Sequence, residues 1–170
     1  PQQVSSAASD VYKRQIRSMP NTACAFGKGI TALYADDQKS NGFKNASNLF
    51  SRTGHVLALE NEGEMHEFTS IIGSGQAFLF QVLKIYLLEL EKIAFNNGNN
   101  LNDVFNHFVS SLGDSFVEEP DFENLINRIK SPGGTTQAGL ESLENSELDK
   151  IFREAFKAAK NRSIEISNEQ

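Results

Sequence analysis

The spacing of apolar residues divides the chain into an extended part followed by a longer helical part. Short apolar runs rich in β-branched and aromatic residues, each bounded by turn residues, predict strands at 16–19, 29–34 and 55–59. Between the last two, residues 46–50 indicate a short helix that ends near Gly54. Three short strands and one helix are too few for a complete dinucleotide-binding fold.

From residue 61 onward the apolar period becomes that of a helix. Gly73, Ser74 and Gly75 open a predicted helix that runs to about Asn97, with apolar side chains on nearly every face. A helix on the surface of a domain carries one apolar stripe, so this helix is expected to be buried on several sides. In a chain of this size, a second subunit is expected to bury these apolar faces.

Further amphipathic helices follow, with apolar residues at i, i+3, i+4 and i+7. They are predicted over residues 101–116, 122–129, 138–143 and 148–159. Asn99 or Asn100 would cap the first of them and Ser146 the last, while Pro132 stops the second. The sequence therefore predicts a mainly α chain with a few short strands near its start.

The pattern gives the chain four segments. Residues 1–15 are small and polar without an apolar period, and we expect a disordered or non-native leader there. The extended segment covers 16–60, the helical segment 61–166 and a short tail 167–170.

Composition and charge limit the functions open to the chain. Its 170 residues, 39% hydrophobic and 22% charged, fit an ordinary soluble domain with a sizeable core. The net charge of -6, with scattered Lys and Arg, argues against a nucleic-acid or anionic-membrane surface and favours small-molecule or protein partners. Lys84, Glu89, Glu91 and Lys92 interrupt the apolar run at 77–95, so we expect a buried helix there and no membrane span.

The residue types that often carry chemistry are few and scattered. A single cysteine, Cys24, excludes an internal disulfide and suggests a reducing, cytoplasmic location. Cys24, His55, His66 and His107 lack metal-ligand spacing, so no metal site is predicted, and the histidines are expected at the surface or in helix packing. The acidic run within 60–67 is expected to be a solvated face.

The segment 131–136, Ser-Pro-Gly-Gly-Thr-Thr, is the strongest candidate for an anion site. Its proline ends one helix, its glycines allow a turn, and Thr135 or Thr136 would cap the next helix. Backbone N–H groups then lie at the positive end of a helix, where a carboxylate or phosphate binds well, and Ser131 and Thr136 add hydroxyl donors. A plain Pro-Gly-Gly connection with a threonine cap explains the same spacing, and spacing alone favours that alternative.

Three motifs, taken in order along the chain, resemble the pyrroline-5-carboxylate reductases. They are R-S-M-P-N-T at 17–22, T-S-I-I-G-S-G-Q-A-F at 69–78 and S-P-G-G-T-T at 131–136, the last followed by Gly139 and Leu140. The resemblance covers about residues 16–166. It implies the end of a truncated Rossmann domain at 16–60, joined to a helical dimerisation domain of the 6-phosphogluconate dehydrogenase C-terminal type at 61–166. The implied activity is NAD(P)H-dependent reduction of 1-pyrroline-5-carboxylate to L-proline.

The resemblance also implies roles for individual residues of the third motif. Ser131 and the backbone N–H groups of Gly133 and Gly134 would hold the substrate carboxylate, and Thr135 would line the same site. Thr136, the implied catalytic residue, would hydrogen-bond near the ring nitrogen. A hydroxyl group and backbone dipoles would be sufficient, because hydride transfer to a C=N bond is chiefly a matter of positioning.

On the cofactor side, the resemblance places Met19, Pro20 and Asn21 beside the nicotinamide ring of NADPH or NADH. No G-x-G-x-x-G motif follows a strand, so the chain alone is not expected to bind the cofactor. The implied partners are a second copy of the chain, as a homodimer or an assembly of dimers, and a cyclic imino acid. Glu119 could lie at the edge of the site by its spacing.

Two departures from the family pattern leave alternatives open. The family usually has proline at or beside Cys24 and at the position of Gln76, which permits a paralogous reductase for another imino acid or keto acid. A further alternative is an inactive dimerisation module. Thr69, Ser70 and Ser74 could contact a ligand, although helix capping explains Ser74 as well.

Overall fold

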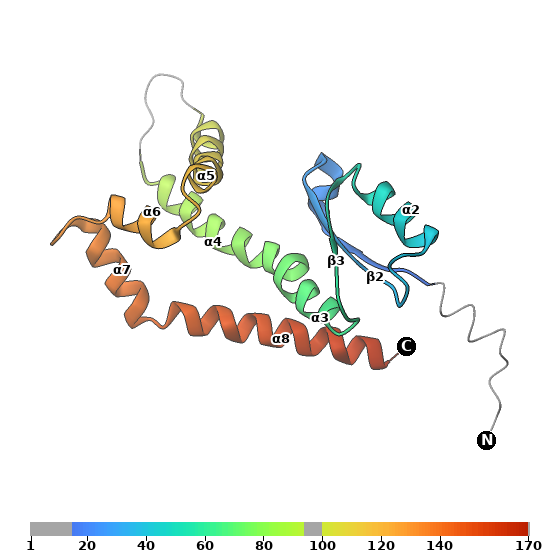
Figure 1. Ribbon diagram of the computed structural model, residues 1–170. Helices are drawn as coiled ribbons and strands as arrows, with labels where there is room; N and C mark the ends of the chain where they lie inside the picture. The colour runs from blue at the N-terminus through green and yellow to red at the C-terminus, as the bar shows by residue number, and fades with distance from the viewer. Residues whose placement is uncertain (1–14, 94–99, 170) are drawn as a thin grey trace. The chain divides into compact units, whose positions relative to one another are not determined.

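The computed structural model describes residues 15–93 and 100–169 (Figure 1). The chain divides into two compact units: unit 1 holds the described residues up to Phe78 and from Glu154 onward, and unit 2 is Leu79–Arg153. The leader predicted for 1–15 lies outside the described residues except for Gln15. The predicted fold class, mainly α with a few short strands, is confirmed.

Unit 1 is built on a 3-stranded sheet in the order β1-β2-β3. The strands are β1 (Arg17–Pro20), β2 (Gly29–Tyr34) and β3 (Gly54–Ala58), with β1 antiparallel and β3 parallel to β2. Between β1 and β2 lies a short 3-10 helix, η1 (Thr22–Phe26). The parallel pair is joined through α2 (Asn41–Phe50), whose Ser40 cap accepts a hydrogen bond from the Phe43 N–H at 3.1 Å. The predicted strands and the helix between them are confirmed.

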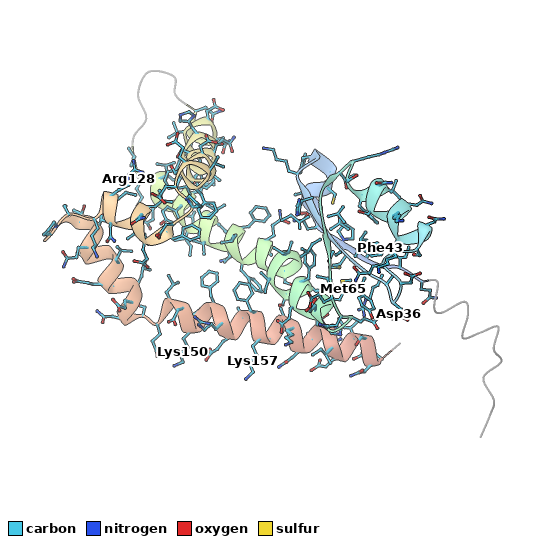
Figure 2. All side chains as sticks on the ribbon, viewed as in Figure 1. Asp36, Phe43, Met65, Arg128, Lys150 and Lys157 are labelled. Carbon is cyan, nitrogen blue, oxygen red and sulfur yellow. The ribbon has the colours of Figure 1, made fainter. Side chains whose placement is uncertain are left out.

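The core of unit 1 is small and lies on both faces of β2. Successive strand residues point to opposite faces, so Ala32 and Leu33, each 0% exposed, join different clusters. One cluster combines Ala32 with Leu59, Met65 and Phe68, and the other combines Leu33 with Ala35 and Phe43. In Figure 2 the labelled Phe43 lies on the α2 side of the sheet and Met65 on the α3 side. Burial on both faces explains why β2 is the most apolar of the strands.

A continuous helix of 27 residues, Glu64–Leu90, follows the sheet. It comprises α3 (Glu64–Phe68), a π-helical segment η2 (Thr69–Ser74) and α4 (Gly75–Leu90). The sequence-based start at Gly73 is therefore wrong. The helix begins earlier because the Glu64 carboxylate accepts hydrogen bonds from the Glu60 N–H and the Asn61 side chain, each at 2.9 Å. It ends at Leu90, short of the predicted Asn97, which itself lies outside the described residues.

The glycines in this helix serve close contacts. A Cβ at Gly73 would lie 3.2 Å from the Met19 methyl carbon, and a Cβ at Gly75 would lie 3.1 Å from the ring of Phe156. Phe156 belongs to α8 (Leu148–Asn168) and also faces Phe78, with ring centroids 5.6 Å apart. Within unit 1 the missing side chains thus let a strand and a second helix approach this helix.

Unit 2 contains most of the remaining helices. They are α5 (Leu101–Glu118), α6 (Phe122–Ile129), α7 (Thr135–Asn145) and the first turns of α8. The cap predicted at Asn100 is confirmed, because its side chain accepts the Asn102 N–H at 2.9 Å. Asp121 caps α6 in the same way.

The cap predicted at Ser146 is wrong. The Ser146 N–H still donates to the Ser142 carbonyl at 3.1 Å, so this residue ends α7. Glu147, at a positive φ of 54°, lies between the two helices, and its carbonyl accepts the first hydrogen bond of α8 from the Ile151 N–H. The start of the last helix therefore lies one residue later than the predicted cap at Ser146 implies.

Burial differs sharply between the two units. None of the described residues of unit 2 is buried, whereas unit 1 contains all the buried residues of the described chain. On α4, Leu79 is 60% exposed and Phe80 58% exposed. The expected burial of this helix on several sides is therefore not provided by the single chain, and its apolar faces are open to another molecule.

By length and composition, the helix Glu64–Leu90 is also the one described helix that could cross a membrane, with a mean hydropathy of 1.5 over its most apolar window. Helices that form the core of soluble assemblies pass the same test. Its composition alone is weak support for a membrane location.

Candidate functional site

The first two sequence motifs meet within unit 1. The Met19 side chain lies against Gly73, where the absence of a Cβ gives it room. Three residues along, the Thr22 hydroxyl donates a hydrogen bond of 2.9 Å to the side-chain oxygen of Gln76 at the start of α4. Segments 54 residues apart are thus joined at two points of the first motif, Met19 and Thr22.

Asn21 has a structural task that the sequence did not reveal. Its side-chain oxygen accepts the Ile30 N–H at 3.0 Å, and its own N–H donates to the Ile30 carbonyl at 3.3 Å. These bonds extend the β1–β2 ladder past Pro20, which has no N–H to contribute. Pro20 itself is exposed and Met19 half-buried, so an apolar edge is held rigidly at this end of the sheet.

Two hydroxyls of the second motif are occupied within their own helix. Thr69 donates to the Met65 carbonyl at 2.7 Å and Ser70 to the Glu67 carbonyl at 2.8 Å. These bonds lie where the helix widens into its π segment, a distortion often found at functional sites. Ligand contact through the Thr69 or Ser70 hydroxyl would require these bonds to break.

The third motif lies in unit 2 and forms the turn between α6 and α7. Gly133 has a φ of 68°, which favours glycine, and the Gly134 N–H donates to the Ser131 carbonyl at 3.0 Å to close the turn. A Cβ at Gly134 would lie 2.2 Å from the Ser131 hydroxyl oxygen. Gly133 is therefore favoured for its backbone conformation, whereas a Cβ at Gly134 would require the Ser131 hydroxyl to rotate away.

The predicted cap at Thr135 or Thr136 is wrong. The N-cap of α7 is Gly134, and no side chain makes a cap hydrogen bond there. Both threonines already lie inside the first turn, so their hydroxyls do not take the cap position. The positive end of α7 is consequently left without a capping side chain, as an anion-binding helix end requires.

One side chain does reach the turn. The side-chain oxygen of Gln137 accepts the Gly133 N–H at 2.9 Å, and the amide nitrogen of Gln137 donates to Glu141 at 2.8 Å. Gln137 was not among the site residues predicted from the sequence. A glutamine three residues after a helix cap commonly reaches back to the preceding backbone, and that signal could have identified it.

Two other candidates from the sequence, His66 and the acidic run at 60–67, have structural partners. His66 hydrogen-bonds the Ser163 hydroxyl on α8 at 2.9 Å, which confirms a helix-packing role for this histidine. In the acidic run, Glu62 pairs with Arg17 at 2.9 Å and Glu67 pairs with Lys160. The run is largely exposed, as expected, and it also forms ion pairs that join the segment before α3 to β1 and α3 itself to α8.

Neither Glu119 nor a metal cluster adds to the site. Glu119 ends α5, and within residues 100–169 no hydrogen bond or ion pair joins it to the 131–136 turn. Across the described part of the chain, no group of three or more His, Cys, Asp or Glu side chains could hold a metal ion.

A separate hollow of about 530 Å³ lies beside β1, between Arg17, Tyr34, Asp36 and Glu62. The Tyr34 hydroxyl donates to Asp36 at 3.0 Å, and this bond raises the pKa of Tyr34 above its ordinary value. The phenol therefore stays protonated well above neutral pH.

Comparison with known proteins identifies the family to which this arrangement belongs. Residues 62–166 match the family described as pyrroline-5-carboxylate reductase dimerisation. The chain belongs to this family. Pyrroline-5-carboxylate reductases of Staphylococcus aureus and Staphylococcus saprophyticus are 32% and 29% identical to it, over 155 and 154 residues. Those alignments cover 89% and 90% of the chain, yet the chain spans only 56% of the length of either relative.

Solved pyrroline-5-carboxylate reductases share the fold. One from Coxiella burnetii is 27% identical with a TM-score of 0.74, over 88% of this chain and 56% of that protein. A pyrroline carboxylate reductase from Plasmodium falciparum, solved with NADP bound, is 25% identical with a TM-score of 0.73, over 87% of this chain and 61% of that protein. The family resemblance inferred from three motifs is confirmed.

Proposed function

We propose that the protein containing this chain reduces 1-pyrroline-5-carboxylate to L-proline with NADPH or NADH. The observation that carries the proposal is the turn at 131–136. It presents the positive end of α7 without a capping side chain, in a chain that belongs to the reductase dimerisation family. The proposed reaction is the one after which the relatives are named. The turn gives a physical reason why the substrate would carry a carboxylate.

The substrate carboxylate would bind at this turn. The Ser131 hydroxyl and the backbone N–H groups of Gly133 and Gly134 are the donors proposed for it, with Thr135 lining the site. The partial positive charge of the helix end favours an anion there and fixes the orientation of the ring. Orientation is the main contribution, since a well-placed reacting pair needs little further assistance.

Thr136 would act at the ring nitrogen. Its side chain is half-buried in the first turn of α7 and is not used as a cap. A hydroxyl there can hydrogen-bond the nitrogen of the cyclic imine and hold it as the C=N bond becomes an amine. NADPH or NADH supplies the hydride when bound.

The residues present fit only the nicotinamide end of that cofactor. Met19 and Pro20 form an apolar edge, and Asn21 is fixed by its bonds to Ile30, which suits a flat ring at the end of β1. We propose Met19, Pro20 and Asn21 as the residues beside the ring. The sequence contains no G-x-G-x-x-G turn for the pyrophosphate, so this part of the proposal concerns the ring alone.

Self-association is part of the proposal because the family is a dimerisation domain and unit 2 has no buried residue within its described part. A homodimer is the simplest closed assembly that covers such apolar faces. We further propose a cytoplasmic location, in keeping with the single half-buried cysteine.

Replacing Thr136 by valine tests the proposed chemistry. Valine keeps the shape and removes the hydroxyl, so kcat/KM for 1-pyrroline-5-carboxylate is expected to fall by roughly 10- to 100-fold, the value of a hydrogen bond to a charged group. The measurement is NADPH oxidation by the protein that contains this chain. Thr136→Ser, which restores a hydroxyl, is expected to recover most of the activity.

Two outcomes would count against the proposal. An unaltered protein that binds NADPH but leaves the imine unreduced would disprove the activity itself. A Thr136→Val variant as active as the unaltered protein would leave the activity standing and remove Thr136 from the mechanism.

A further inference from the structure

The Gly133 N–H is a donor that the chain already uses. The side-chain oxygen of Gln137 accepts it at 2.9 Å, in the position where an oxygen of a bound carboxylate would accept it. The Gly134 N–H differs, because it donates to the Ser131 carbonyl and closes the turn itself. Of the two backbone donors proposed for the substrate, the Gly133 N–H is therefore the one whose present acceptor a bound ligand can replace.

Glu141 holds the Gln137 side chain in this orientation. The Gln137 amide nitrogen donates to a Glu141 carboxylate oxygen at 2.8 Å, one turn further along α7. With its nitrogen fixed, the amide directs its oxygen to Gly133. This excludes the flipped arrangement, which would bring an N–H group against the Gly133 N–H.

We propose that Gln137 sets the affinity of the turn for carboxylates, because its amide oxygen occupies the Gly133 N–H and competes there with the substrate carboxylate. The inference rests on the proposed function, which places that carboxylate at this turn. An anion displaces the neutral amide oxygen because charge-assisted hydrogen bonds are roughly twice as strong as neutral ones. A neutral ring offers no acceptor that can do so, and Gln137 then keeps its position.

A purely structural role for Gln137 makes the opposite prediction. A glutamine at this position of a helix can simply stabilise the first turn, and its loss would then disorder the turn and weaken binding of every ligand. If Gln137 competes with the carboxylate, its loss instead strengthens binding, and only for ligands with a carboxylate. The direction of the change separates the two roles.

The test compares two substrates and two variants in the protein that contains this chain. For Gln137→Ala, the KM for 1-pyrroline-5-carboxylate is expected to fall by about 2- to 10-fold with kcat unchanged, the range set by one neutral hydrogen bond. The KM or inhibition constant of 1-pyrroline, which lacks the carboxylate, is expected to stay the same. For Gln137→Glu, an internal anion faces the donor, and the KM for the carboxylated imine is expected to rise at least about 10-fold.

Glu144→Ala is the control, because Glu144 is an exposed residue of the same helix whose side chain makes no described contact with the turn. Binding of L-proline, followed through the Gly133 amide signal by NMR, gives a readout independent of turnover. Gln137→Ala is expected to bind proline more tightly by the same factor as its fall in KM.

The results that would overturn the inference differ from the result that would overturn the proposed function. Raised or unchanged KM and proline affinity in Gln137→Ala would overturn the inference, as would an equal change for 1-pyrroline. An unaltered protein that fails to reduce the carboxylated imine would overturn the proposed function instead, since that result does not depend on any variant.

Discussion

Replacing Leu79 by aspartate is expected to weaken self-association of the protein by at least about a thousandfold. Leu79 is 60% exposed on α4 in the single chain, where its apolar neighbours are also open. Covering the rest of a leucine is worth about 1–2 kcal/mol, and a symmetric interface counts it twice. An unpaired carboxylate buried in the same place adds several kcal/mol.

Leu49→Asp is the matched control for this prediction. Leu49 is also 60% exposed, but it lies on α2 of unit 1, outside the region that matches the dimerisation family. Sedimentation velocity over a range of concentrations is expected to show monomer for Leu79→Asp and the unaltered distribution for Leu49→Asp. Equal behaviour of the two variants would show that α4 does not form the interface.

Replacing Gly54 by alanine is expected to destabilise unit 1 by about 3 kcal/mol, from backbone strain and overpacking together. Gly54 has a φ of 146°, and a Cβ there would lie 2.0 Å from the Gly29 carbonyl oxygen and 2.5 Å from its nitrogen. These are backbone atoms of the neighbouring strand, which can move only if β2 and β3 separate at this end.

The loss is expected to extend to the proposed cofactor edge. Gly29 precedes Ile30, which holds Asn21 through two hydrogen bonds. Gly42→Ala on α2 is the control, because a Cβ there makes only ordinary contacts, with Ile16 at 3.5 Å and the Ser40 hydroxyl at 3.9 Å, and is expected to stabilise the helix by up to about 1 kcal/mol. Urea unfolding of both variants checks the prediction, and equal midpoints would contradict it.

Local sequence patterns predicted the elements whose cause is local. The strand expected at 29–34 coincides with β2, since its apolar residues and flanking glycine suffice to define it. The cap at Asn100 was found for the same reason. The family, too, followed from three short motifs, because each keeps its residues close together in the chain.

The errors came from contacts between distant residues. Gly73 and Gly75 indicated a helix start, but each accommodates a side chain, Met19 or Phe156, that comes from another part of the chain. No periodicity in the sequence reveals such a pair. The cap predicted at Thr135 or Thr136 failed because Gly134 is the N-cap and both threonines lie within the first turn of the helix.

The roles proposed for Ser131, Gly133, Gly134, Thr135 and Thr136 remain predictions, as do those of Met19, Pro20 and Asn21. The structure adds two side-chain interactions that the motifs did not reveal, one between Gln137 and Gly133 and the other between Thr22 and Gln76. The second uses the residue that stands where the family usually has proline. A proline there could not accept the Thr22 hydrogen bond, so this departure gives the chain a contact of its own.

The absence of buried residues in the described part of unit 2 has a thermodynamic consequence. Helices that gain their apolar cover only from another molecule have little to hold them together when that molecule leaves. Folding of unit 2 and assembly should then be one equilibrium, governed by mass action. We expect the melting temperature to rise with protein concentration, and dilution to remove helical circular dichroism along with the oligomer.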